Sequence, residues 1–176
     1  MTELAYGFIG VGRMGSLMSA RLLERGHPLP IYDTAPAATT AALARAAIAH
    51  GSAAALAGHA DVIFLSLPSP EIVQAVALGA DGIMAGNRAP RVVDFSTTGP
   101  RPAGIVARAL APTGIVYVDA PVSGGLSGAR DGSLAVTVSC AGAVFDELQS
   151  ILRRTITRCA QIHPDNFSAA ATASQP

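Results

Sequence analysis

The chain has 176 residues, enough for one domain with a substantial core or for one domain and part of a second. Its 12 basic residues, all of them arginine, balance 12 acidic residues, so the charge gives no reason to expect nucleic-acid binding. No apolar run is long enough to span a bilayer and no basic segment marks a signal peptide, so we expect a cytoplasmic protein without a membrane anchor.

The first predicted unit joins a strand to a helix through a turn rich in glycine. An apolar run at residues 6–9 predicts a buried strand, and a helical pattern follows over residues 14–25. Gly10, Gly12 and Gly15 have the spacing G-x-G-x-x-G. A helix that begins directly after such a turn points its unpaired N–H groups, and the positive end of its dipole, towards an anion. This unit is typical of a site for the pyrophosphate of a dinucleotide.

Asp33 follows the second predicted strand, at residues 29–32, and is the expected partner of an adenosine ribose hydroxyl. The next two residues, Thr34 and Ala35, provide no arginine that would neutralise a 2′-phosphate. The sequence therefore predicts NAD as the cofactor in preference to NADP. The competing interpretation is a structural glycine turn followed by an ordinary aspartate at the end of a strand.

The remaining predicted strands and helices alternate along the chain. Apolar runs predict strands at residues 61–66, 91–95, 115–119 and 134–139, and a last edge strand at 157–162. Helical patterns predict helices at residues 36–49, 55–59, 70–78, 100–110 and 145–153. This alternation predicts right-handed βαβ units and an α/β fold, with a doubly wound, Rossmann-type and mostly parallel sheet.

Polar loops follow most of these strands. They are Gly10–Gly15, Asp33, Ser66–Pro68, Ser96–Thr97 and Ser123–Gly125. Because ligands of doubly wound sheets bind outside the carboxyl ends of the strands, we expect these loops to converge on one edge. Taken alone, each Ser or Thr is more simply interpreted as a helix cap or a turn residue.

Several motifs, in this order, resemble the β-hydroxyacid dehydrogenase family, typified by 3-hydroxyisobutyrate dehydrogenase and tartronate semialdehyde reductase. The stretch Phe8–Gly15, followed by Gly26-His27, looks like the cofactor signature of that family. Three later segments resemble its cofactor-contacting loop, its nicotinamide-side loop and its substrate-binding segment: Ser66–Pro68, Asp94–Thr97 and Asp119–Gly125. The resemblance covers residues 6–163, and we expect residues 1–163 to form one dinucleotide-binding domain.

The resemblance implies hydride transfer between a small 3-hydroxyacid and a nicotinamide cofactor. It assigns binding of this cofactor, NAD or NADP, to Gly10, Val11, Gly12, Arg13, Met14, Gly15, Asp33, Leu67, Pro68 and Thr97. It places Thr97 beside the nicotinamide and the substrate, whose carboxylate would be held by hydroxyl and backbone N–H groups of Ser123, Gly124 and Gly125. An ordinary Ser-Gly-Gly turn is the alternative for these last three residues.

The sequence lacks the residue that carries acid–base chemistry in this family. Family members use a lysine on a long helix after the cofactor domain, whereas this sequence contains no lysine. Arginine cannot act as a base at neutral pH, so no catalytic residue is assigned. Residues 164–176 have neither the lysine motif nor apolar periodicity, and we expect them to be disordered. We therefore expect a truncated member, without the helical C-terminal domain, that is weakly active or inactive alone.

Two further expectations concern partners and rival functions. The surface that the helical domain normally covers is expected to be exposed, which favours self-association or binding of a partner chain. The rival to a hydroxyacid dehydrogenase is a non-catalytic dinucleotide-binding module or a decayed gene product. A short-chain dehydrogenase is disfavoured, because the sequence has neither the glycine spacing of that class nor a Tyr-x-x-x-Lys pair.

Overall fold

The structure, a computed structural model, describes residues 4–24, 26–88, 91–155 and 158–162. Its strands are β1 (Tyr6–Ile9), β2 (Pro30–Tyr32), β3 (Ile48–Ala49), β4 (Val62–Leu65), β5 (Arg91–Asp94), β6 (Val116–Asp119), β7 (Val122–Ser123), β8 (Ala135–Ser139) and β9 (Arg158–Ile162). They form one sheet in the order β3-β2-β1-β4-β5-β6-β8-β7, with β9 beside β8. The pairs from β3 to β6 are parallel, and β8 runs antiparallel to β6 and β7. The run β3-β2-β1-β4-β5-β6 has the strand order of the Rossmann fold, so the predicted fold class is confirmed.

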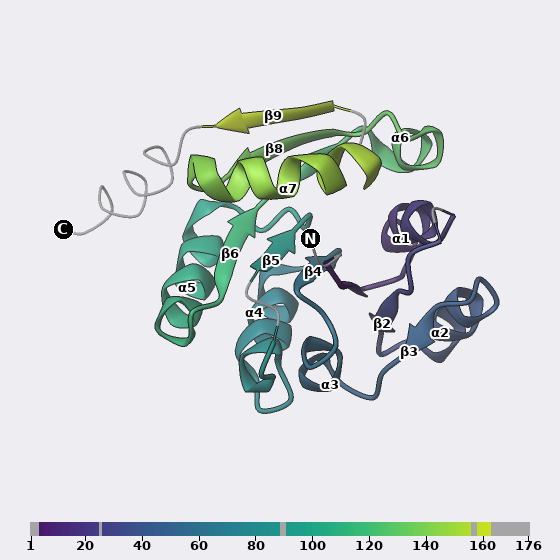
Figure 1. Ribbon diagram of the computed structural model, residues 1–176, viewed down its shortest axis with the longest axis horizontal. Helices are drawn as coiled ribbons and strands as arrows, with labels where there is room; N and C mark the ends of the chain where they lie inside the picture. Colours follow the sequence, from purple (N-terminus) through teal and green to yellow (C-terminus); the bar gives the residue numbers. More distant parts are fainter. Residues whose placement is uncertain (1–3, 25, 89–90, 156–157, 163–176) are drawn as a thin grey trace.

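Helices cover both faces of this sheet. They are α1 (Gly15–Leu23), α2 (Pro36–Leu43), α3 (Ala53–Ala57), α4 (Pro70–Leu78), α5 (Pro100–Leu110), α6 (Gly125–Asp131) and α7 (Gly142–Thr155), with 3₁₀ turns at Ile83–Ala85 and Ala111–Thr113. Side chains of α1, α2, α6 and α7 pack into one apolar core, and those of α3, α4 and α5 pack into a second core on the opposite face. Figure 1 shows α4 and α5 side by side, with α7 on the other side of the strands.

Successive side chains of a strand point to opposite faces of the sheet, which explains why there are two cores. Phe8 and Phe64 belong to the first core, whereas their chain neighbours Ile9 and Ile63 belong to the second. The rings of Phe64 and Phe95 stack in the first core with their centroids 5.4 Å apart. A strand that is buried on both faces needs apolar residues at every position, which is why β1 and β4 read as continuous apolar runs.

Helix α4 begins directly after an N-cap serine, Ser69. Ser69 Oγ accepts the Ile72 N–H at 3.4 Å, and Pro70 occupies the first turn, where its missing N–H costs nothing. Glu71 follows in the same turn, where the helix dipole favours a carboxylate. These residues fix α4 directly after the loop that follows β4, with the bounds predicted from the sequence.

The prediction of one helix over residues 36–49 is wrong at its C-terminal end. Helix α2 stops at Leu43, and Ala46 then adopts a φ of +66°. The chain turns back to the sheet, where the N–H of Ile48 donates to the Leu29 carbonyl at 3.0 Å. Main-chain pairing at the edge of the sheet therefore overrides the helical preference of alanine. Two further elements, β7 and α6, have no counterpart among the predicted elements.

The large apolar side chains that are exposed come from several separate elements. In the described residues they are Leu4, Leu43, Ile48, Ile72, Met84, Ile105 and Val116. The expected partner surface stays a prediction. The predicted disordered tail at residues 164–176 lies outside the described residues. Every helix in the described ranges is too short or too polar to cross a bilayer.

Candidate cofactor site

The glycine turn between β1 and α1 packs too closely for side chains at two of its positions. Gly10 has a φ of +86°, and a Cβ on it would lie 2.3 Å from the carbonyl oxygen of Ser66. A Cβ on Gly15 would lie 1.8 Å from the carbonyl oxygen of Gly10. Glycine at these positions therefore lets β1, α1 and the loop after β4 approach one another.

Gly12 differs from these two glycines because it faces open space. A Cβ built on Gly12 would meet no other atom within 4 Å. Backbone N–H groups at this end of α1 donate no hydrogen bond within the described part of the chain, namely those of Gly12, Arg13, Met14 and Gly15. The dipole of α1 adds positive potential at the same place. The N–H groups of the turn therefore form a main-chain cradle for an anion.

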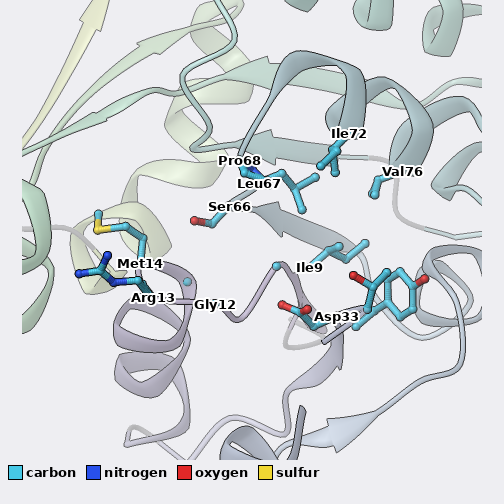
Figure 2. Close-up of a pocket in the computed structure, with 14 residues that line it drawn as sticks. Ile9, Gly12, Arg13, Met14, Asp33, Ser66, Leu67, Pro68, Ile72 and Val76 are labelled. Carbon is cyan, nitrogen blue, oxygen red and sulfur yellow. The ribbon is translucent and has the colours of Figure 1, made fainter. Parts of the chain in front are cut away.

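A cavity of about 470 Å³ opens at this cradle, a volume typical of small-molecule sites. Its walls come from the turn, the ends of β1 and β2, the loop after β4 and the first turns of α4 (Figure 2). The predicted cofactor residues that line it are Gly10, Gly12, Arg13, Met14, Gly15, Asp33, Leu67 and Pro68. The structure thus brings together residues that are far apart in the sequence.

Asp33 lies at one end of the cavity with its carboxylate partly exposed. Its Oδ1 accepts the N–H of Ala35 at 2.8 Å, which fixes the orientation of the side chain. No described residue donates to its other oxygen. Figure 2 shows Arg13 on the other side of the glycine turn from Asp33. The second carboxylate oxygen of Asp33 is therefore available to a hydrogen-bond donor in the cavity.

Helix α4 supplies an apolar wall that the sequence analysis missed. Ile72 and Val76 lie four residues apart on α4 and line the cavity together with Leu67 (Figure 2). Ile72 is 42% exposed. The i, i+4 spacing was a readable signal, but only the structure shows that this face of α4 meets a cavity. Tyr32 and Thr34 are also unpredicted lining residues, whereas Ile9 and Ser66 line the cavity within the predicted segments Phe8–Gly15 and Ser66–Pro68.

Three of the predicted site segments do not line this cavity. Val11 is 2% exposed and packs in the first core. Thr97 is exposed in the loop after β5. Ser123 ends β7, and Gly124 and Gly125, with φ values of +129° and +62°, lead into α6. The roles expected for these residues stay predictions.

A buried polar cluster lies at the carboxyl ends of β5 and β6. Asp94 is fully buried, its Oδ1 accepts the Ser96 N–H at 2.8 Å, and its Oδ2 accepts the Tyr117 hydroxyl at 2.5 Å. Ser96 Oγ in turn accepts the N–H of Leu67 at 2.9 Å. Because Leu67 lines the cavity, the cluster is connected to the candidate cofactor site.

Asp119 pairs in register with Asp94 across β5 and β6. Burial raises the pKa of the Asp94 carboxyl. Burial, followed by the charge of Asp94, raises the pKa of Asp119 to about 6. Burial and the same charge also raise the pKa of Tyr117, so its hydroxyl stays protonated and donates to Asp94. The buried carboxyl of Asp94 beside the half-buried carboxyl of Asp119 therefore favours uptake of a proton below neutral pH.

Asp119→Asn is expected to raise the free energy of unfolding at pH 7 and to change it much less at pH 4. A carboxyl with a raised folded-state pKa stabilises the fold fully only below its unfolded pKa of about 3.9. That contribution is lost as the pH rises through about 6, whereas asparagine cannot ionise. Urea unfolding at both pH values measures the difference, with Asp131→Asn on the exposed end of α6 as the control. Equal changes at the two pH values would contradict the assignment.

Comparison with known proteins decides the family. The family described as the NAD binding domain of 6-phosphogluconate dehydrogenase matches residues 5–163. The chain is 40% identical over 151 residues to 2-(hydroxymethyl)glutarate dehydrogenase from Eubacterium barkeri, covering 85% of this chain and 50% of that protein. It is 37% identical over 153 residues to 3-hydroxyisobutyrate dehydrogenase from Pseudomonas aeruginosa, covering 86% and 51%. The chain belongs to the β-hydroxyacid dehydrogenase family.

The solved structures agree with this assignment to the β-hydroxyacid dehydrogenases. A 3-hydroxyisobutyrate dehydrogenase from Mycobacterium tuberculosis with L-serine superposes with a TM-score of 0.86 at 28% identity, covering 98% of this chain and 59% of that one. The described fold is thus the NAD binding domain that the matching family model describes. The chain spans about half the length of the curated relatives it matches.

Proposed function

We propose that the cavity beside Gly12 binds NAD, and that this domain serves hydride transfer from a 3-hydroxyacid. The anion cradle carries the proposal, because open space at Gly12 and unpaired amides at the N-terminus of α1 suit a pyrophosphate. The bound cofactor would supply the acceptor for the hydride.

Each part of the adenosine half of the dinucleotide, and the pyrophosphate, has a matching surface in the cavity. The N–H groups of residues 12–15 would hold the pyrophosphate, and the carboxylate of Asp33 would accept a hydrogen bond from the ribose. Ile72, Val76 and Leu67 offer apolar surface that suits the faces of the adenine ring. This arrangement supports binding of the whole adenosine half of the cofactor.

The substrate would lie further along the carboxyl edge of the sheet. Thr97 follows β5, and Ser123–Gly125 lie at the end of β7, which comes after β6, the neighbour of β5. Ser123 and the two glycines are exposed, so their hydroxyl and N–H groups are available to a carboxylate. We propose that they hold the carboxylate of a small 3-hydroxyacid beside the nicotinamide.

Asp33→Ser is expected to weaken NAD binding about fivefold to tenfold and to leave NADP binding unchanged or stronger. The substitution removes the acceptor for the 2′-hydroxyl and the negative charge that repels a 2′-phosphate. Isothermal titration with both cofactors measures the change. Asp131→Asn is the control, because it also removes one negative charge. Equal dissociation constants of the wild-type protein for NAD and NADP would contradict the preference for NAD.

A non-catalytic dinucleotide-binding module is the second candidate. The observation that favours it is the absence of lysine from the sequence, because the family carries its acid–base chemistry on a lysine. NAD binding without hydroxyacid oxidation would support the module, and oxidation restored by an added partner chain would support a dehydrogenase completed by that chain.

A further inference from the structure

We propose that Asp94 is a positioning residue for the cofactor: through Ser96 it holds the loop at Leu67 against the dinucleotide cavity. This inference rests on the proposed function, since it names a residue that would act on NAD without touching it. Asp94 does not line the cavity and is fully buried. Its effect on binding would therefore be transmitted through hydrogen bonds.

Asp94 is fixed by both neighbouring strands. Its backbone carbonyl accepts the N–H of Ala120 at 2.8 Å, and its Oδ2 accepts the Tyr117 hydroxyl at 2.5 Å. On the other side, the N–H of Phe95 donates to the Leu65 carbonyl at 2.9 Å. A carboxylate held at this point of the sheet can therefore fix the position of the loop after β5.

The carboxylate orients Ser96, and Ser96 orients the cofactor loop. Asp94 Oδ1 accepts the Ser96 N–H at 2.8 Å, which closes a local turn. Ser96 is 5% exposed, and its Oγ accepts the Leu67 N–H at 2.9 Å across 29 residues of sequence. A part-buried N–H without that acceptor would carry a desolvation cost, so the bond selects one position of the loop.

Ser96→Ala is expected to weaken NAD binding about fivefold to tenfold, because it removes the acceptor for the Leu67 N–H. Asp94→Asn keeps the size of the side chain but leaves one accepting oxygen for two donors, and about threefold to fivefold weaker binding is expected. In the double variant the dissociation constant should stay within about twofold of that of Ser96→Ala, since Asp94 acts through Ser96. Effects that multiply in the double variant would overturn the proposal.

Ser19→Ala is the matched control. Ser19 is also a buried serine, 3% exposed, and its Oγ donates to the Ser16 carbonyl at 3.4 Å on α1. Its loss should leave the dissociation constant for NAD within about twofold of the wild-type value. Equal weakening by Ser19→Ala and Ser96→Ala would show a general loss of packing and would overturn the proposal.

Hydrogen exchange of the Leu67 amide tests the same link without cofactor. Exchange at Leu67 should be at least about tenfold faster in Ser96→Ala and in Asp94→Asn than in the wild type. If Asp94→Asn does not fold, Tyr117→Phe replaces it, because it removes one of the two hydrogen bonds that hold the carboxylate. Unchanged exchange would overturn the inference, whereas failure of the wild-type protein to bind NAD would contradict only the proposed function.

Discussion

Gly12→Ala is expected to weaken NAD binding at least about tenfold while leaving the free energy of unfolding within about 0.5 kcal/mol of the wild-type value. The added methyl group meets no protein atom within 4 Å, so it costs the fold nothing. It projects instead into the space where the pyrophosphate would approach the main chain. Isothermal titration gives the affinity, and urea unfolding gives the stability. Unchanged affinity for NAD would contradict the anion cradle.

Gly15→Ala is the matched comparison, because it is expected to lower the free energy of unfolding, which Gly12→Ala leaves unchanged. Its methyl group would lie 1.8 Å from the Gly10 carbonyl oxygen, so α1 has to move away from β1. Overpacking of this kind costs about 1–3 kcal/mol of stability. Loss of stability in Gly15→Ala but not in Gly12→Ala separates the structural glycine from the binding glycine. Equal stabilities of the two variants would contradict this distinction.

The second large effect concerns catalysis. The purified 176-residue chain is expected to oxidise 3-hydroxyisobutyrate with NAD about 10²- to 10⁴-fold more slowly than the Pseudomonas aeruginosa enzyme under the same conditions. The reason is that a positioned general base contributes a factor of this size, and the chain contains no lysine. An arginine side chain cannot act as the base that takes a proton from the substrate hydroxyl at neutral pH.

Steady-state production of NADH measures this rate. Gly12→Ala serves as the control, because any slow turnover that depends on the cavity should fall with the affinity for NAD. A wild-type rate within about tenfold of the relative's rate would contradict the proposal that the general base is missing.

The sequence indicated residues that line the candidate cavity where those residues follow strands. The spacing of Gly10, Gly12 and Gly15 indicated the turn, and the place of Asp33 after β2 indicated a second part of the cavity wall, because strand order brings both to one edge. Ile72 and Val76 were missed because apolar residues four apart on a helix usually face the core. The bond from Leu67 to Ser96 was missed because hydrogen bonds between loops leave no periodic pattern in a sequence.

Alanine content explains why the helix predicted over residues 36–49 runs too far. Residues 36–49 are rich in alanine, so propensity alone extends the helix to its end. The left-handed turn at Ala46 gives up a few helical hydrogen bonds, which pairing of β3 with β2 replaces. Tertiary contacts decide such cases, and a single sequence does not reveal them.

The shortness of β3 has a consequence for assembly. An open sheet recruits a strand from another molecule through a row of unsatisfied main-chain groups along its outermost strand. Ile48–Ala49 presents only two residues for such a row, although Ile48 itself is 50% exposed. Strand addition is therefore discouraged at this border of the sheet, and a second molecule would have to dock there through side chains.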